Sequence, residues 1–206
     1  QDNNWPPLKT SIADQNSGSS SDRNQARGPN LGCASPITPL TASRTTVEAG
    51  LAAMGPVHRG GTTGNLGLSW GWRTLSPDWR GLWGGATPST HPLDYDTPLM
   101  EKVVVILTDG TNQFYDHDKG SGTPKSDYTA YGRLEDMGVT SLGDGRDILD
   151  TRMSATCTAM KSEGIGIYSI IFGSSPDSTA QDLFRNCATS PSMYFYAPTN
   201  NALAEA

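Results

Sequence analysis

Residues 102–110, Lys-Val-Val-Val-Ile-Leu-Thr-Asp-Gly, decide the fold class of this 206-residue chain. The five consecutive apolar residues at 103–107 predict a β-strand, and their continuity favours a strand covered on both faces, as in a parallel sheet. Thr108, Asp109 and Gly110 then end the strand with a polar turn. We therefore expect a buried strand that presents Asp109 at the carboxyl edge of a sheet, where open α/β folds bind ligands.

Strands and helices alternate after this stretch, which is typical of an α/β fold with an open, mostly parallel sheet and flanking helices. The expected elements are a strand over 102–107, a helix over 146–162, a strand over 165–172, a helix over 178–187, a strand over 193–196 and a helix from residue 200.

The first 35 residues differ in composition from the rest of the chain. Residues 1–35 are rich in Asn, Ser, Asp, Gly and Pro, and we expect a disordered or loosely packed arm or insertion there. Residues 36–206 then form the domain, with long loops at 77–98 and 111–145. Helical periodicity over 47–54 and 66–75 adds two helices before the first strand.

Composition and charge exclude several classes of protein. The net charge of −6 comes from residues 101–206, where 14 acidic residues face 8 basic ones. Without a basic stripe, nucleic-acid binding is not expected. The longest apolar runs, 103–107 and 165–172, fall far short of the roughly 20 residues of a membrane span. No heptad pattern persists, which excludes a coiled coil.

Two short motifs could hold a metal ion. Asp109, at a strand end, offers a carboxylate to a hard cation such as Mg²⁺, or else caps a turn or the next helix. In Gly60-Gly61-Thr62 the glycines let a loop pass close to an ion and the Thr hydroxyl is a neutral ligand. The alternative is that Thr62 caps a helix.

Seven segments of the chain carry a resemblance to a known family: PITPLT (36–41), GGTTGNLGLSWGWR (60–73), LSP (75–77), KVVVILTDGTN (102–112), KSEGIGIYSIIF (161–172), CA (187–188) and YFYA (194–197). Together they resemble the von Willebrand factor type A domain, in particular the TadG-like proteins of Flp/Tad pilus assembly. The resemblance covers roughly residues 30–206.

The resemblance implies a metal-ion-dependent adhesion site (MIDAS) built from three loops and holding Mg²⁺ or Mn²⁺. Thr62 matches the threonine of the second loop and Asp109 matches the aspartate of the third. The first loop of the family, DxSxS after the central strand, does not occur in this sequence. We therefore expect an incomplete sheet that lacks its first central strand, in a chain truncated at both ends.

The resemblance also implies a partner and a location. Such a domain is not an enzyme, and it binds a protein of the pilus or cell envelope, with an acidic side chain of the partner completing the metal's coordination. It lies outside the cytoplasm, and an upstream segment anchors it in the inner membrane.

The cysteines are compatible with that location. Cys157 lies in the predicted helix before the strand at 165–172, and Cys187 lies near the end of the helix after it. Helices on one face of a sheet could bring them together as a disulfide in an oxidising envelope, or they could remain two buried free thiols. Cys33 is left over.

Two other functions stay open. A metal-dependent phosphohydrolase would use Asp109 as a metal ligand, Thr111 as the nucleophile, and Asp116 and His117 at a second site. A purely structural envelope domain would keep only a vestigial metal site. The common sequence motifs of nucleophilic hydrolases and metalloproteases are absent.

Overall fold

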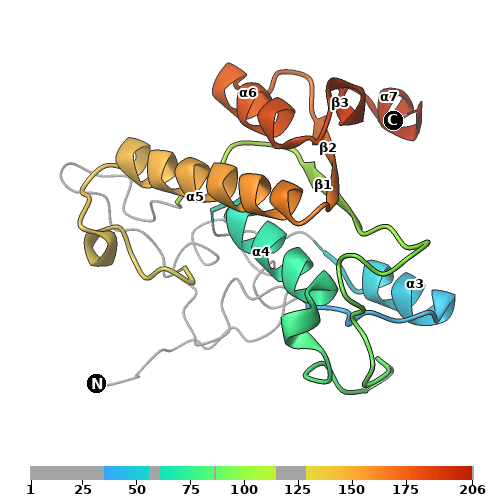
Figure 1. Ribbon diagram of the computed structural model, residues 1–206. Coiled ribbons are helices and arrows are strands. Elements are labelled where there is room, and N and C mark those ends of the chain that lie inside the picture. The colour runs from blue at the N-terminus through green and yellow to red at the C-terminus, as the bar shows by residue number, and fades with distance from the viewer. Residues whose placement is uncertain (1–34, 56–60, 86, 115–128, 206) are drawn as a thin grey trace. The chain divides into compact units, whose positions relative to one another are not determined.

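The computed structural model describes residues 35–55, 61–85, 87–114 and 129–205 (Figure 1). The chain divides into two compact units, 1–61 and 62–206. Apart from Ser35, the predicted arm lies outside the described residues. In the first unit, helix α3 (Arg44–Ala52) begins after Ser43, whose hydroxyl accepts a hydrogen bond from the Thr46 N–H.

The second unit contains a three-stranded parallel sheet in the order β1-β2-β3. Strand β1 spans Val103–Thr108, β2 spans Gly166–Phe172 and β3 spans Tyr194–Ala197. Helix α5 (Leu142–Ser162) connects β1 to β2, and α6 (Ser178–Cys187) connects β2 to β3. The α/β class predicted from the sequence is confirmed.

The other helices of this unit are α4 (Gly64–Leu75), before the sheet, and the short α7 (Asn200–Glu205), which packs on β3. Helix α5 begins four residues earlier than predicted, because the Ser141 hydroxyl caps it by accepting a hydrogen bond from the Asp144 N–H. Across the described residues, no helix is both long and apolar enough to cross a membrane.

One face of the sheet carries the core. The even-numbered residues of β1 and the odd-numbered residues of β2 share this face, since side chains alternate along a strand. Helix α5 contacts both α4 and α6, and it lies between them in Figure 1. The fully buried residues that join the three helices to the sheet include Leu68, Met153, Met160, Ile167 and Phe184.

The opposite face of β1 is open, which corrects the prediction of a strand covered on both faces. Val103, Val105 and Leu107 are 45%, 62% and 57% exposed. The three helices that form the core with the sheet, α4, α5 and α6, lie on the other face. A continuous apolar run indicated the strand correctly but did not show how many of its faces are covered.

The outer edge of β1 is also open. The Lys102 carbonyl accepts from the Gly166 N–H at 2.9 Å, so the even-numbered residues of β1 bond to β2. The backbone groups of Val103, Val105 and Leu107 therefore point away from β2. Within the part of the chain that the structure describes, no strand pairs with this edge, where the resemblance implies a missing central strand.

Candidate metal-binding site

The carboxyl ends of the three strands meet at one edge of the sheet. After β2, the Gly173 N–H donates to the Ala197 carbonyl at the end of β3, at 3.0 Å. A Cβ built on Gly173 would lie 3.6 Å from the Asp109 carbonyl oxygen, and Gly173 has a φ of +134° that favours glycine. Asp109 thus lies at the edge where the sequence predicts it.

The side chain of Asp109 is exposed to solvent. Thr108, not Asp109, stabilises the turn after β1, since its Oγ1 accepts from the Gly110 N–H at 3.2 Å and donates to the Gly110 carbonyl at 3.1 Å. None of the described residues donates a hydrogen bond to the Asp109 carboxylate. The turn-capping alternative for Asp109 is therefore not what the structure shows, and both carboxylate oxygens can accept a ligand.

Thr62 lies next to the loop that follows Asp109. The Thr62 N–H donates to the Gln113 carbonyl at 2.8 Å, and the Gln113 N–H donates to the Thr62 carbonyl at 2.9 Å. The residue at the N-cap of α4 is Thr63, whose side chain makes no capping hydrogen bond, so the helix-cap alternative for Thr62 is wrong. The structure thus brings the two predicted ligand loops together.

Asn112 joins the same two loops and was not singled out from the sequence. Its side chain is only 3% exposed. Its Oδ1 accepts from the Gly64 N–H at 2.7 Å, and its Nδ2 donates to Asp150 Oδ1 at 2.8 Å. An Asn in a loop ordinarily indicates only a turn, and both partners are far away in the sequence, so no local signal could have found it.

Asp150, on α5, is half-buried behind these loops. Burial is the main effect on its carboxyl group and raises its pKa, while the hydrogen bond from Asn112 and the positive charge of Arg146 oppose that change. A proton is therefore held more firmly on Asp150 than on an exposed aspartate.

The side-chain oxygens of Asp109 and Thr62 are of the chemical type that a hard cation binds. A carboxylate and a hydroxyl are the oxygen ligands that Mg²⁺ and Mn²⁺ prefer. Two such donors fill only part of an octahedral shell, and the described residues contain no group of three or more His, Cys, Asp or Glu side chains that could hold a metal. Thr62 and Asp109 alone could therefore supply only part of the coordination that such a cation needs.

The residues of the phosphohydrolase alternative are only partly described. Thr111 lines a cavity of about 170 Å³ together with Asn112 and Arg146. Asp116 and His117, the second-site ligands in that hypothesis, lie outside the described residues.

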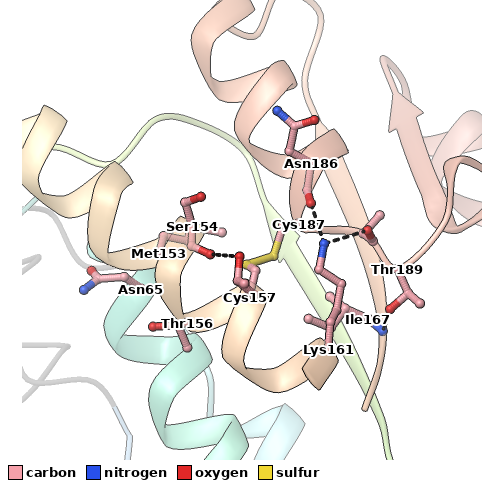
Figure 2. Close-up of a disulfide and its surroundings, with 12 residues drawn as sticks. Asn65, Met153, Ser154, Thr156, Cys157, Lys161, Ile167, Asn186, Cys187 and Thr189 are labelled. Atoms are coloured by element: carbon pink, nitrogen blue, oxygen red, sulfur yellow. Dashed lines mark hydrogen bonds between the residues drawn. A yellow bond between two sulfur atoms is a disulfide. The ribbon is translucent and has the colours of Figure 1, made fainter. Parts of the chain in front are cut away.

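Cys157 and Cys187 form a disulfide that joins α5 to α6 (Figure 2). Both residues are buried in the core, at 1% and 2% exposed. Lys161, one turn along α5, adds a second link by donating to the Asn186 carbonyl at 2.8 Å, in the last turn of α6. The two helices that follow β1 and β2 are thus cross-linked on the covered face.

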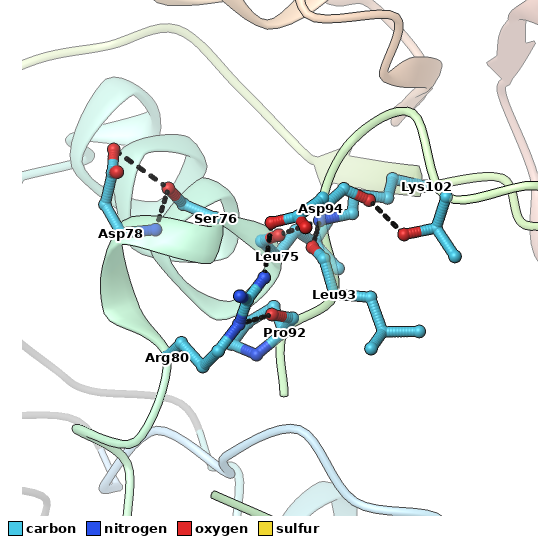
Figure 3. Close-up of polar contacts among 9 residues, drawn as sticks. Leu75, Ser76, Asp78, Arg80, Pro92, Leu93, Asp94 and Lys102 are labelled. Atoms are coloured by element: carbon cyan, nitrogen blue, oxygen red, sulfur yellow. Dashed lines mark hydrogen bonds and ion pairs between the residues drawn. The ribbon is translucent and has the colours of Figure 1, made fainter. Parts of the chain in front are cut away.

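A buried lysine lies at the opposite, amino end of the sheet. Lys102 is 7% exposed, and its Nζ donates to the carbonyls of Leu75 and Leu93 (Figure 3). The ammonium group also lies 4.4 Å from the centre of the Tyr95 ring. Burial lowers the pKa of Lys102, and the charge of Arg80 lowers it further. Because its hydrogen-bond partners are backbone carbonyls, we interpret Lys102 as a structural residue.

Comparisons with known proteins find only distant similarity, and only to solved structures. No family model matches the sequence, and a search of curated proteins finds no match. Among solved structures, the pilus adhesin SpaC from Lactobacillus rhamnosus GG is 15% identical with a TM-score of 0.48, over 79% of this chain and 20% of that one.

Proximal thread matrix protein 1 from the mussel byssus, in a structure with a zinc-occupied MIDAS motif, is 18% identical with a TM-score of 0.46, over 81% of this chain and 30% of that one. A second crystal form of the same protein gives 19% identity and a TM-score of 0.29, over 53% and 18%. This chain therefore spans at most 30% of these proteins.

Proposed function

We propose that the chain is part of a non-catalytic adhesion domain of the von Willebrand A type, from a TadG-like pilus-assembly protein, that binds its partner through a divalent cation. The observation that carries this proposal is the backbone bridge between Thr62 and Gln113. It holds the threonine loop against the loop that begins with Asp109, at the edge of a parallel sheet where α/β folds bind ligands.

In this proposal the Asp109 carboxylate and the Thr62 hydroxyl hold Mg²⁺ or Mn²⁺. When bound, the cation supplies positive charge that attracts an acidic side chain of the partner protein. The exposure of Asp109 supports this role, since its oxygens face solvent without an internal donor.

The remaining ligands would come from a strand with a DxSxS sequence at its carboxyl end. The outer edge of β1 offers the unpaired backbone groups of Val103, Val105 and Leu107, which only an extended strand can satisfy in a regular ladder. A strand parallel to β1 would end beside Asp109, and its apolar side chains would add to the open face of the sheet.

We also propose that the domain works in the cell envelope, outside the cytoplasm, anchored in the inner membrane through an upstream segment. The Cys157–Cys187 disulfide supports an oxidising compartment, because such bridges persist there and are rare in a reducing cytosol.

Calorimetric titration of Mg²⁺ and Mn²⁺ tests the ligand assignment, with and without a synthetic peptide that places DxSxS after an apolar strand. We expect Asp109→Ala and Thr62→Val to weaken Mn²⁺ binding in the presence of the peptide by about tenfold or more, the loss of a direct ligand. Asp96→Ala removes another exposed carboxylate, and Thr62→Ser keeps the hydroxyl, so both controls should bind as the unchanged chain does.

Equal affinity in Asp109→Ala and the unchanged chain would contradict the metal site. Negligible binding by every variant would favour a structural domain with a vestigial site, and phosphatase turnover lost in Asp109→Ala would favour an enzyme.

A further inference from the structure

We infer that Asn112 is a positioning residue that fixes the Thr62 loop relative to Asp109, so that both can act on one ligand. The inference rests on the proposed function for what that ligand is, a divalent cation. The geometry that supports it belongs to the chain alone.

Asn112 replaces a missing helix cap. The first N–H groups of a helix need acceptors from outside the helix, yet the Thr63 side chain at the N-cap of α4 makes no such bond. Instead, Asn112 Oδ1 accepts from the Gly64 N–H at 2.7 Å, from a position 48 residues away in the sequence. The start of α4 is therefore held by the loop after β1.

The orientation of the Asn112 amide is fixed by α5. Its Nδ2 donates to Asp150 Oδ1 at 2.8 Å and also lies 3.6 Å from Met153 Sδ. A carboxylate accepts hydrogen bonds but donates none. If the amide turned over, its oxygen would face the Asp150 carboxylate and its NH₂ group would face the Gly64 N–H. Asp150 therefore keeps Asn112 Oδ1 directed at Gly64.

Gly64 allows this close approach. A Cβ at residue 64 would lie 3.1 Å from Asn112 Oδ1 and 3.6 Å from Met153 Sδ, so any larger residue would require the Asn112 amide to shift by a few tenths of an ångström. The Asn112 contact adjoins the backbone bridge between Thr62 and Gln113. Residues 62–64 and 112–113 are thus joined by three consecutive hydrogen bonds.

This strip joins the two ligand loops at a short distance from both ligands. Gly64 lies two residues after Thr62, and Asn112 lies three residues after Asp109. Ligands must be held within about 0.5 Å of their working positions to bind well. Loss of the Asn112 bond would loosen the strip at its Gly64 end, beside Thr62, and leave the Asp109 side in place.

Amide hydrogen exchange and Mn²⁺ line broadening, both followed by NMR on the full chain, separate positioning from folding. In Asn112→Ala we expect the Gly64 N–H to exchange about tenfold faster or more, while the Ile167 N–H in β2 keeps its protection. Broadening by Mn²⁺ should weaken at the Thr62 amide and persist at the Asp109 amide. Gln113→Ala removes an exposed side chain of the same loop and should change neither measurement.

A swap of the two side chains tests the direction of the bonds. Asn112→Asp keeps an acceptor for Gly64 but places two carboxylates together, so the exchange of Gly64 should again be faster. Adding Asp150→Asn restores one donor between the pair, and the double variant should recover Gly64 protection and Thr62 broadening.

Unchanged Gly64 exchange in Asn112→Ala, or failure of the double variant to recover, would overturn the inference. If Mn²⁺ broadens no amide of the unchanged chain, the proposed function fails, and the exchange rates still decide whether Asn112 holds the loop. Equal broadening in the unchanged chain and Asn112→Ala would overturn the positioning role and leave the metal site standing.

Discussion

The two faces of the sheet are built from the same strands and differ in almost everything else. On one face, Ile167 and its neighbours are fully buried under three helices, two of which are joined by a disulfide. On the other, Val105 is 62% exposed. Apolar side chains make a face of the sheet suitable for burial. Whether that face is buried depends on the helices that pack on it.

Removal of the disulfide should have the largest effect on the covered face. The bridge closes a loop with a sequence separation of 30 residues, and the loss of such a constraint on the unfolded chain costs about 3–4 kcal/mol. We expect the free energy of unfolding of Cys157→Ser/Cys187→Ser to fall by that amount in urea titrations.

A reducing agent gives the matched control for this prediction. It should destabilise the unchanged chain by a similar amount and leave the double variant unaffected. If the unchanged chain without reducing agent and the double variant unfold at the same urea concentration, the disulfide does not stabilise the covered face.

A matched pair of isoleucines in β2 compares the two faces directly. Ile167 points into the core and is 0% exposed, whereas Ile170 points to the open face and is half-buried. Replacing a buried Ile by Ala leaves a cavity, so Ile167→Ala should lower the free energy of unfolding by about 3 kcal/mol. Ile170→Ala should cost about 1 kcal/mol, because water already reaches its side chain.

Thermal and urea unfolding of both isoleucine variants gives the comparison. Equal losses would mean that the open face is covered in solution, for example by a second molecule, and in that case the loss for Ile170→Ala should depend on protein concentration.

A smaller effect than that of the disulfide or of Ile167→Ala is expected for Lys102, the charged group on the covered side of β1. Lys102→Met removes the donor to the Leu75 and Leu93 carbonyls, and unsatisfied buried acceptors should cost about 1–2 kcal/mol at neutral pH.

The pH dependence of Lys102 has a definite sign. Its pKa is lowered in the folded protein, so the unfolded chain binds more protons at pH values between that lowered pKa and the ordinary lysine pKa of 10.5. The stability of the unchanged chain should therefore gain a contribution from Lys102 as the pH rises through this window. Lys102→Met should lack that contribution, and parallel stability profiles of the two proteins would contradict the assignment.

The order of strands and helices could be predicted because it depends on local patterns. Alternating apolar runs and caps give β1, α5, β2, α6 and β3 in sequence, and the turn after β1 gives Asp109 its place at the edge of the sheet. The predicted start of α5 lies too late in the sequence, because the Ser141 cap is a weaker signal than the apolar period that follows it.

The tertiary details of the site could not be predicted in the same way. Asn112 is a turn residue by local pattern, and its role comes from Gly64 and Asp150, which are 48 and 38 residues away. Lys102 is the first residue of the predicted strand at 102–107, and its burial comes from the packing of α4 and the loop before β1, which the strand pattern does not show. Contacts between distant segments leave no periodic trace in the sequence.

The disulfide also determines how the domain would respond to mechanical tension. The covalent path from Cys157 to Cys187 runs through one sulfur–sulfur bond, and it bypasses the end of α5, all of β2 and most of α6. A force applied at the two ends of the chain would not load β2, and about 100 Å of extended chain would stay unreleased. When the chain is pulled at its ends, β2 would therefore stay folded after β1 and β3 have separated from it.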